Sequence, residues 1–244
     1  MTIPLASALS LLRDPRGRHA NDVSVARELN VQRNPLALPA GLELQWLGTA
    51  GFALRYAGCT LLVDPYVTRP RAKAVFGRQV LAPDAEAITE HVPSADAILV
   101  GHTHFDHALD VPAIAARSGA RVYGSRSALN LMQKLGHAAL ATEVEAHRVY
   151  AIGPFEVTFV PSLHSKLILG LRVPSDGELT CDHLDGLRGG DYRCGQVWGI
   201  HIAVAGKIFY HQGSANLIDD EVRHHDAKSN IECDTIILDG ESTS

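Results

Sequence analysis

The sequence has little of what marks exported or membrane-spanning proteins. Its four cysteines, Cys59, Cys181, Cys194 and Cys233, form no CxxC pair and no dense cluster, which excludes a disulfide scaffold and favours a reducing compartment. The apolar residues 3–12 are too few to span a membrane, and no basic residue precedes them as a signal peptide requires. We therefore expect a short helix there and a cytoplasmic protein without a membrane span.

Positive charge is also in short supply. The chain carries 22 basic and 27 acidic residues, for a net charge of -5, so no overall positive field would attract a phosphate backbone. Nucleic acid is therefore not expected as a partner. Hydrophobic residues make up 46% and charged residues 20% of the 244 residues, which is an ordinary globular composition. A folded protein that acts on a small-molecule substrate fits these proportions.

The chain divides by composition into an extension and a main domain. Residues 1–40 combine a helical stretch with four prolines and are expected to form an N-terminal extension. Residues 41–244 carry the core pattern. Three short β-rich runs separated by glycines open this domain and predict antiparallel strands at residues 44–47, 52–56 and 60–63.

Strands and helices alternate after a loop rich in arginine and proline. The apolar residues 97–100 predict a strand buried on both faces. Helices are expected at residues 111–118, 127–135 and 217–224, the second of them capped by Ser125 or Ser127. Further strands are expected at residues 121–123, 155–160, 197–204, 207–211 and 234–238, and a long loop at 176–195. This order predicts two sheets covered by helices, a layered α/β sandwich.

The strongest chemical signal is an HxHxDH array directly after the predicted strand at 97–100. His102, His104, Asp106 and His107 place four candidate metal ligands within six residues. Neutral imidazoles and a carboxylate bind zinc and similar divalent ions, and a loop at the end of a strand can aim them at one point. Without a metal, so many polar groups beside an apolar strand would be costly to bury.

The HxHxDH array resembles the signature of the metallo-β-lactamase superfamily. The segments WLGTAGF at 46–52 and LLVDPY at 61–66 are similar to the opening strands of that fold, particularly in its branch of lactone and phospholipid hydrolases. The segment PSLH at 161–164 resembles the loop that supplies a third histidine. The resemblance covers residues 42–239 and implies a four-layer αβ/βα sandwich.

By this resemblance, His102, His104 and His164 hold the first metal ion, and Asp106 and His107 belong to the second. Three neutral histidines leave one coordination position open, where water can lose a proton at a pKa of about 7. Asp106 and His107 are then also the expected catalytic residues, with Asp106 acting as a base or as a ligand. Zinc is the expected cofactor, with manganese or iron as alternatives.

Other polar residues have both a functional and an ordinary interpretation. Asp64 either accepts a hydrogen bond from a ligand imidazole, as in the family, or simply makes the turn before Pro65. Lys166 either binds an anionic substrate group or lies in solvent, and His183 and Asp185 are weaker candidates at the border of the site. A separate thiolate site of Cys181, His183 and Cys194 is a further alternative, although its spacing matches no usual zinc pattern.

Two features depart from the family pattern. Ser214 stands where the family usually has a bridging aspartate, and a hydroxyl is a weaker ligand than a carboxylate, so a second metal site is expected to be weak. The sequence also ends at Ser244, before the family's last helix, strand and metal histidine, so either it is a fragment or this layer is missing. Candidate substitutes for the missing ligand are His211, the best placed, and His224, His225 and Asp239.

These observations favour a metal-dependent hydrolase of an ester, lactone, amide or phosphodiester bond. One alternative is a phosphodiesterase of the phospholipase-like branch, suggested by the opening segments. Another is a family member that binds metal without turnover, suggested by Ser214 and the missing layer. A missing strand would leave a sheet edge exposed, which makes a homodimer a further expectation.

Overall fold

The computed structural model describes residues 37–165, 173, 175–180, 182, 186–213, 215–216, 218, 220–221 and 235–238. The chain forms two compact units. One consists of Gly41–Ser165 and Val173–Ser244 and carries all the elements discussed below. The other consists of Met1–Ala40 and Lys166–Arg172, of which only residues 37–40 are described. The expected helix at 3–12 lies outside the described residues, and the N-terminal extension stays a prediction.

The first sheet has six strands in the order β1-β2-β3-β4-β5-β6. The first three pair antiparallel, as the glycine-separated runs predict, and the remaining strands continue the sheet in parallel. These strands are β1 (Glu43–Gly48), β2 (Gly51–Tyr56), β3 (Cys59–Val63), β4 (Ala97–Leu99), β5 (Arg121–Gly124) and β6 (Ala141–Glu143). All three residues of β4 are buried, as expected of a strand covered on both faces.

The second sheet follows the order β11-β8-β9-β10-β12, with β7 paired to β8. The strand β8 is longer than the expected 155–160 and runs on to His164, where it pairs with β11. The strands are β7 (Val149–Ile152), β8 (Phe155–His164), β9 (Val197–Val204), β10 (Lys207–His211), β11 (Ala215–Asn216) and β12 (Thr235–Leu238). The extension of β8 brings its last residue to the site described below.

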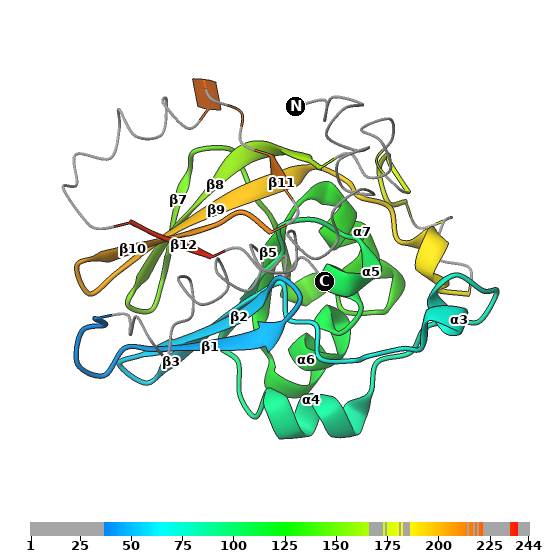
Figure 1. The fold of residues 1–244 in the computed structure, drawn as a ribbon, viewed down its shortest axis with the longest axis horizontal. Coiled ribbons are helices and arrows are strands. Elements are labelled where there is room, and N and C mark those ends of the chain that lie inside the picture. The colour runs from blue at the N-terminus through cyan, green and yellow to red at the C-terminus, as the bar shows by residue number, and fades with distance from the viewer. Residues whose placement is uncertain are drawn as a thin grey trace, which may run out of the picture. The chain divides into compact units, whose positions relative to one another are not determined.

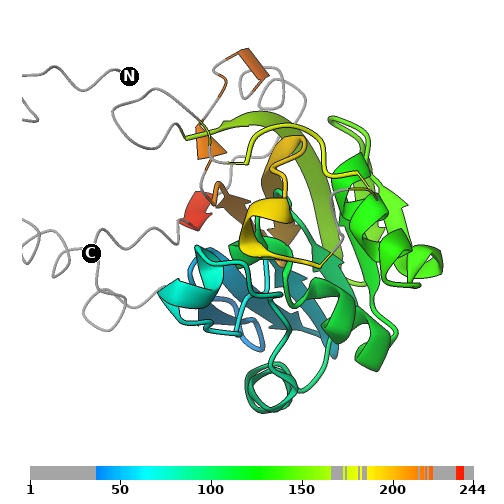
Figure 2. The ribbon, with the colours of Figure 1, turned by 90° about the vertical axis from the view of Figure 1, so that its right-hand side faces the viewer.

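Helices cover the first sheet (Figure 1). The two longest described helices contact β5, and α7 also contacts β6. The helices are α3 (Ala72–Val75), α4 (Ala85–His91), α5 (Phe105–Ala108), α6 (Val111–Ser118) and α7 (Arg126–Lys134), with short 3-10 turns at Ala138–Leu140 and Gly189–Asp191. No helix in the described part of the chain is long and apolar enough to cross a membrane. Figure 2 shows the same helices and sheets after a turn of 90° about the vertical axis.

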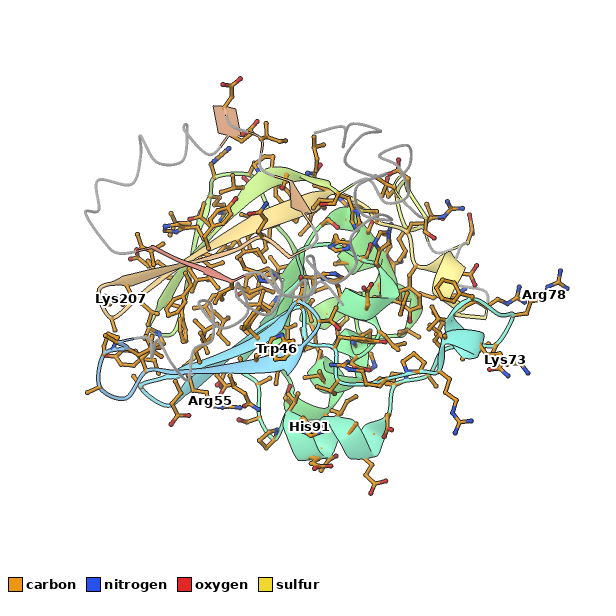
Figure 3. All side chains as sticks on the ribbon, viewed as in Figure 1. Trp46, Arg55, Lys73, Arg78, His91 and Lys207 are labelled. Carbon is orange, nitrogen blue, oxygen red and sulfur yellow. The ribbon has the colours of Figure 1, made fainter. Side chains whose placement is uncertain are left out.

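The main core lies between the first sheet and its helices. Its members come from β3, β4 and β5 on one side and from α4, α6 and α7 on the other, and include Leu62, Ile98, Val122, Ile114 and Met132. Burial of such side chains stabilises each by about 1.5–3 kcal/mol. Charged side chains such as Lys73 and Arg78 are exposed instead and project away from the α3 region (Figure 3).

The expected layered α/β arrangement is confirmed, and several elements have the expected bounds. The helix at 111–118 and the strands at 197–204 and 207–211 are observed as predicted. The segment before residue 97, in which the sequence predicts a loop rich in arginine and proline, also contains the short helices α3 and α4, which were not predicted. Asp84 starts α4, and its carboxylate accepts hydrogen bonds from the backbone of Glu86 and Ala87.

The expected cap of α7 was also wrong. Ser125 occupies the N-cap position but makes no capping hydrogen bond with its side chain. Ser127 Oγ instead accepts a hydrogen bond from the backbone N–H of Leu179 at 2.9 Å, which ties a distant loop to the helix. The helix expected at 217–224 lies mostly outside the described residues. The absence of a final helix and strand stays a prediction.

Candidate metal centre

Three histidines that the sequence singled out converge at the ends of β4 and β8. The ring centroids of His102, His104 and His164 lie 4.7 to 4.8 Å from one another. Nε2 of His102 and Nδ1 of His104 are 3.1 Å apart. Because zinc binds imidazole nitrogens at about 2.0–2.1 Å, two nitrogens on one ion lie at most about 4 Å apart. The nitrogens of His102 and His104 meet this limit, and a ring nitrogen of His164 lies within 4.8 Å of them.

The polar loop leaves the first sheet through Gly101. Its backbone N–H donates to Oδ1 of Asp64 at 2.7 Å, and a Cβ atom at Gly101 would lie 2.9 Å from Oδ2 of the same carboxylate. Glycine is thus required where the Asp64 carboxylate meets the loop. The short helix α5 then begins after His104 and carries Asp106 and His107.

Burial decides the protonation of these rings. His102 is 2% exposed, and burial together with the charges of His107, His104 and His164 holds its pKa well below the usual range. Neighbouring imidazoles cannot all be positively charged at such short range, so the surroundings favour the neutral form of His102, which has one nitrogen with a lone pair. His164 hydrogen-bonds through Nδ1 to the carbonyl of Ser165 at 2.7 Å. With the proton on Nδ1, Nε2 of His164 is the nitrogen that can bind a cation.

Asp64 both makes a turn and contacts the ring of His107, one of the predicted ligands. Its backbone has a φ of 43°, which makes the turn after β3. Its Oδ2 also lies 2.8 Å from Nδ1 of His107, the hydrogen bond expected from the family pattern. Burial alone would raise the pKa of Asp64, but His107 and His211 hold it below its usual range, so the carboxylate is ionised. An ionised Asp64 fixes the proton of His107 on Nδ1 and leaves Nε2 as the other ring nitrogen.

His107 forms a second cluster with Asp64 and His102. One potential ligand atom from each of these three residues lies within 4.8 Å of the others, and all three residues are buried. The rings of His102 and His107 are 3.8 Å apart between centroids. Among the described residues, Asp106 is in neither this cluster nor the first. Burial raises the pKa of the Tyr66 hydroxyl, and the negative charge of Asp106 raises it further. The roles of Asp106 as ligand and base stay predictions.

His211, the favoured substitute ligand, is buried and bonded to the other side of Asp64. Its Nε2 lies 3.0 Å from Oδ2 of Asp64, and its ring meets Phe52 edge-on. The nitrogen that faces the cluster is thus engaged by the carboxylate, so the structure gives His211 a supporting position. Ser214, His224, His225 and Asp239 lie outside the described residues, as do Lys166, Cys181, His183 and Asp185.

Sequence reasoning did not connect Cys194 with the three histidines. One potential ligand atom from each of His102, His104, His164 and Cys194 lies within 4.8 Å of the others. Burial, with the charge of Asp176, raises the pKa of the Cys194 thiol to about 12. Cys194 is distant from the HxHxDH array in the chain, so no local spacing signals this proximity.

The donors present fit a divalent cation. Neutral imidazole nitrogens and sulfur are the atoms that zinc and its neighbours in the transition series prefer. The first cluster lies where water is largely excluded, since His104 and His164 are each only 9% exposed. His164 and His107 each have one ring nitrogen engaged by an oxygen acceptor, as metal-binding histidines usually do.

Comparison with known proteins agrees with the class that this fold and site define, a two-sheet α/β protein with a cluster of histidines that could hold a metal ion. A family described as the beta-lactamase superfamily domain matches residues 60–244. A UPF0173 metal-dependent hydrolase of Carboxydothermus hydrogenoformans is 31% identical over 185 residues, which cover 73% of this chain and 65% of that protein. Another of that name, from Myxococcus xanthus, is 36% identical over 91 residues, which cover 37% of this chain and 28% of that protein.

The chain belongs to the β-lactamase superfamily. It spans less than two thirds of the length of these curated relatives. Among solved structures, CmlA, a diiron beta-hydroxylase from Streptomyces venezuelae, is 18% identical with a TM-score of 0.50, covering 88% of this chain and 39% of that one. At this identity the likeness shows the fold alone. The expectation of a metallo-β-lactamase type of fold is confirmed.

Proposed function

We propose that the chain is a metal-dependent hydrolase whose first ion is held by His102, His104 and His164. The convergence of these three buried rings carries the proposal. The name shared by its relatives, metal-dependent hydrolase, supports the same activity. We expect zinc first, with manganese or iron as alternatives, because a site of three imidazoles accepts several divalent ions. The substrate class is a small molecule with an ester, lactone, amide or phosphodiester bond.

When bound, a divalent ion supplies Lewis acidity and an activated nucleophile from water. The residues of the chain orient the ligand rings and keep bulk water away from the site. Asp64 keeps a proton on Nδ1 of His107 and so directs the opposite edge of this ring to the site. Asp106, half-buried on α5, is the proposed base and a ligand of a weaker second ion, together with His107. Burial of the histidines excludes bulk water and strengthens each electrostatic contact.

Metal analysis of purified variants tests the proposal. The unmodified chain is expected to bind one ion firmly, and H102A and H164A are each expected to lose both this ion and hydrolysis. His91 is an exposed histidine on α4, labelled in Figure 3, and H91A is the matched control that should keep both. Unchanged metal content in H102A and H164A would contradict the assignment of the site.

Two alternative functions are proposed beside the metal-dependent hydrolase. A phosphodiesterase of the phospholipase-like branch is favoured by the segments at 46–52 and 61–66, and a panel of lactones and phosphodiesters would distinguish it. A metal-binding protein without turnover is favoured by the fourth donor, Cys194, because sites with four protein ligands are usually structural. Metal-replete protein that hydrolyses neither panel would support this second alternative.

We also propose a cytoplasmic location and a homodimer. The two described cysteines, Cys59 and Cys194, are both free thiols, which fits a reducing compartment. The dimer proposal depends on an exposed edge of the sheet. Light scattering that shows only monomer over a wide range of concentrations would remove it.

A further inference from the structure

Cys194 lies against the three histidines of the first cluster. Its Sγ is within 4.8 Å of the potential ligand nitrogens of His102, His104 and His164, and its side chain is 2% exposed. Three of these residues come from strand ends of two different sheets, whereas Cys194 comes from the segment that leads into β9. The meeting of all four side chains is therefore a product of the tertiary fold.

The backbone around Cys194 is paired with the HxH loop. The N–H of Thr103 donates to the carbonyl of Cys194 at 3.0 Å, and its hydroxyl donates to the carbonyl of Arg193 at 2.5 Å. The N–H of Trp198 donates to the carbonyl of Gly101 at 2.8 Å. Thr103 lies between His102 and His104 in the sequence, so these hydrogen bonds keep Cys194 close to the two rings.

The other side of the segment is equally constrained. The N–H of Cys194 donates to the carbonyl of Ser175 at 2.9 Å. Gly195 has a φ of +67°, and a Cβ atom there would lie 2.4 Å from Oγ of Ser127 at the start of α7. Only glycine fits that left-handed, closely packed position. Cys194 is thus held from several directions, with its sulfur beside the imidazoles.

A buried cysteine is often a small apolar side chain, and Cys194 also contacts Val197 and Val173. Packing explains those two contacts. It does not explain a sulfur beside three ring nitrogens, because an apolar side chain of similar size would fill the same space without a metal-binding atom. The donors of the cluster, three imidazoles and one thiol, are of the types that bind zinc in proteins.

We propose that Cys194 is a thiolate ligand of the ion held by His102, His104 and His164. The inference rests on the metal site put forward above. On binding, the sulfur–metal bond forms as the S–H bond breaks, and the proton passes to solvent. The thiolate offsets one of the two charges of the cation. Since thiolate is a soft ligand, it favours zinc and cobalt over manganese and magnesium. If all four side chains bind the ion, hydrolysis would require water or substrate to bind at a fifth coordination position.

Cobalt substitution of the full chain tests the proposal without measuring activity. The wild-type protein is expected to show a thiolate-to-cobalt charge-transfer band in the near ultraviolet that saturates at one equivalent. C194S and C194A should lose this band and bind cobalt at least about tenfold more weakly, as perturbed metal sites usually do. Competition between zinc and manganese should become less selective in both variants.

Controls separate this outcome from other cysteines and from misfolding. C59S, and a double variant C181S/C233S, should keep the band. Circular dichroism of the metal-free variants shows whether they keep the fold. If the variants misfold, the cobalt spectrum of the wild-type protein still tests the proposal by itself. If wild-type protein binds cobalt more tightly than H102A does but lacks the band, the proposed role of Cys194 is overturned and the histidine site is not. Wild-type protein that binds no cobalt, or H102A that binds it equally well, overturns the metal site and this inference together.

Discussion

Oδ2 of Asp64 and Nε2 of His211 lie 3.0 Å apart, although 147 positions separate the two residues in the chain. Asp64 follows β3 of the first sheet, and His211 ends β10 of the second. The same carboxylate oxygen also engages Nδ1 of His107. A single buried carboxylate therefore joins the two sheets beside the candidate metal centre and orients the ring of His107.

Asp64→Asn is expected to weaken metal binding. The amide can accept hydrogen bonds only through its one oxygen, so it cannot satisfy His107, His211 and Gly101 together. Loss of such a supporting contact usually costs about 10–100-fold in metal affinity. Titration against a chelator measures the change. D96N is the matched control, because that exposed carboxylate accepts from Thr60 away from the site. Equal affinities in wild type and D64N would contradict the prediction.

The stabilising contribution of Asp64 is expected to decline in acid. Its pKa in the folded protein lies below the unfolded value of about 3.9, so the ionised form stabilises the fold above that value. This contribution is lost as the pH falls through the lower, folded pKa. Urea unfolding of metal-free wild type and D64N should show a difference in the free energy of unfolding that shrinks below about pH 4. A difference that grows toward acid would be the opposite result.

Thr103→Val is expected to loosen the Cys194 segment. The valine keeps the shape but removes the hydroxyl that donates to the carbonyls of Arg193 and Cys194. The free energy of unfolding should fall by about 1–3 kcal/mol, because the carbonyl of Arg193 loses its hydroxyl donor, whereas the carbonyl of Cys194 keeps the backbone N–H of Thr103. Chemical denaturation measures this loss. T89V, an exposed site on α4, should change stability by no more than about 0.5 kcal/mol.

Asp110→Ala is expected to destabilise the loop that follows β3. The buried carboxylate accepts hydrogen bonds from the backbone of Val67 at 2.7 Å and from the backbone of Thr68 at 2.8 Å. Both N–H groups would lose their acceptor, at about 1–3 kcal/mol each. Urea unfolding should show a loss of at least about 2 kcal/mol. D110N, which keeps one acceptor oxygen, should lose less, and equal losses in both variants would contradict this account.

Local patterns in the sequence predicted most of the elements that carry the site. The apolar residues 97–100 and the polar array after them correspond to β4 and its loop, because a strand buried on both faces needs apolar side chains throughout. The signal for α4 was also present, since Asp84 is a favoured N-cap residue. The arginines and prolines around it indicate a loop instead. The four-residue α3 buries no side chain and has no apolar periodicity to reveal it.

Asp110 shows why other roles could not be read from the chain. It stands at the N-cap of α6, a position where aspartate side chains often cap a helix, but its side chain makes no capping hydrogen bond. The distant residues Val67 and Thr68 engage its carboxylate instead. Whether the carboxylate binds the backbone of its own helix or that of a distant segment depends on the fold, which brings residues 67 and 68 next to it.

The sequence by itself determined the chemistry of the loop after β4, because two imidazoles at i and i+2 beside a carboxylate are a local arrangement. It also determined the fold class through the order of its apolar runs. The family resemblance indicated His164 and His211 as candidates, but only the tertiary structure decided how these distant groups lie and that Cys194 joins them. His164, Cys194 and His211 reach the site from the second sheet or the segment before it, and their positions depend on strand register and backbone pairing between segments far apart in the chain.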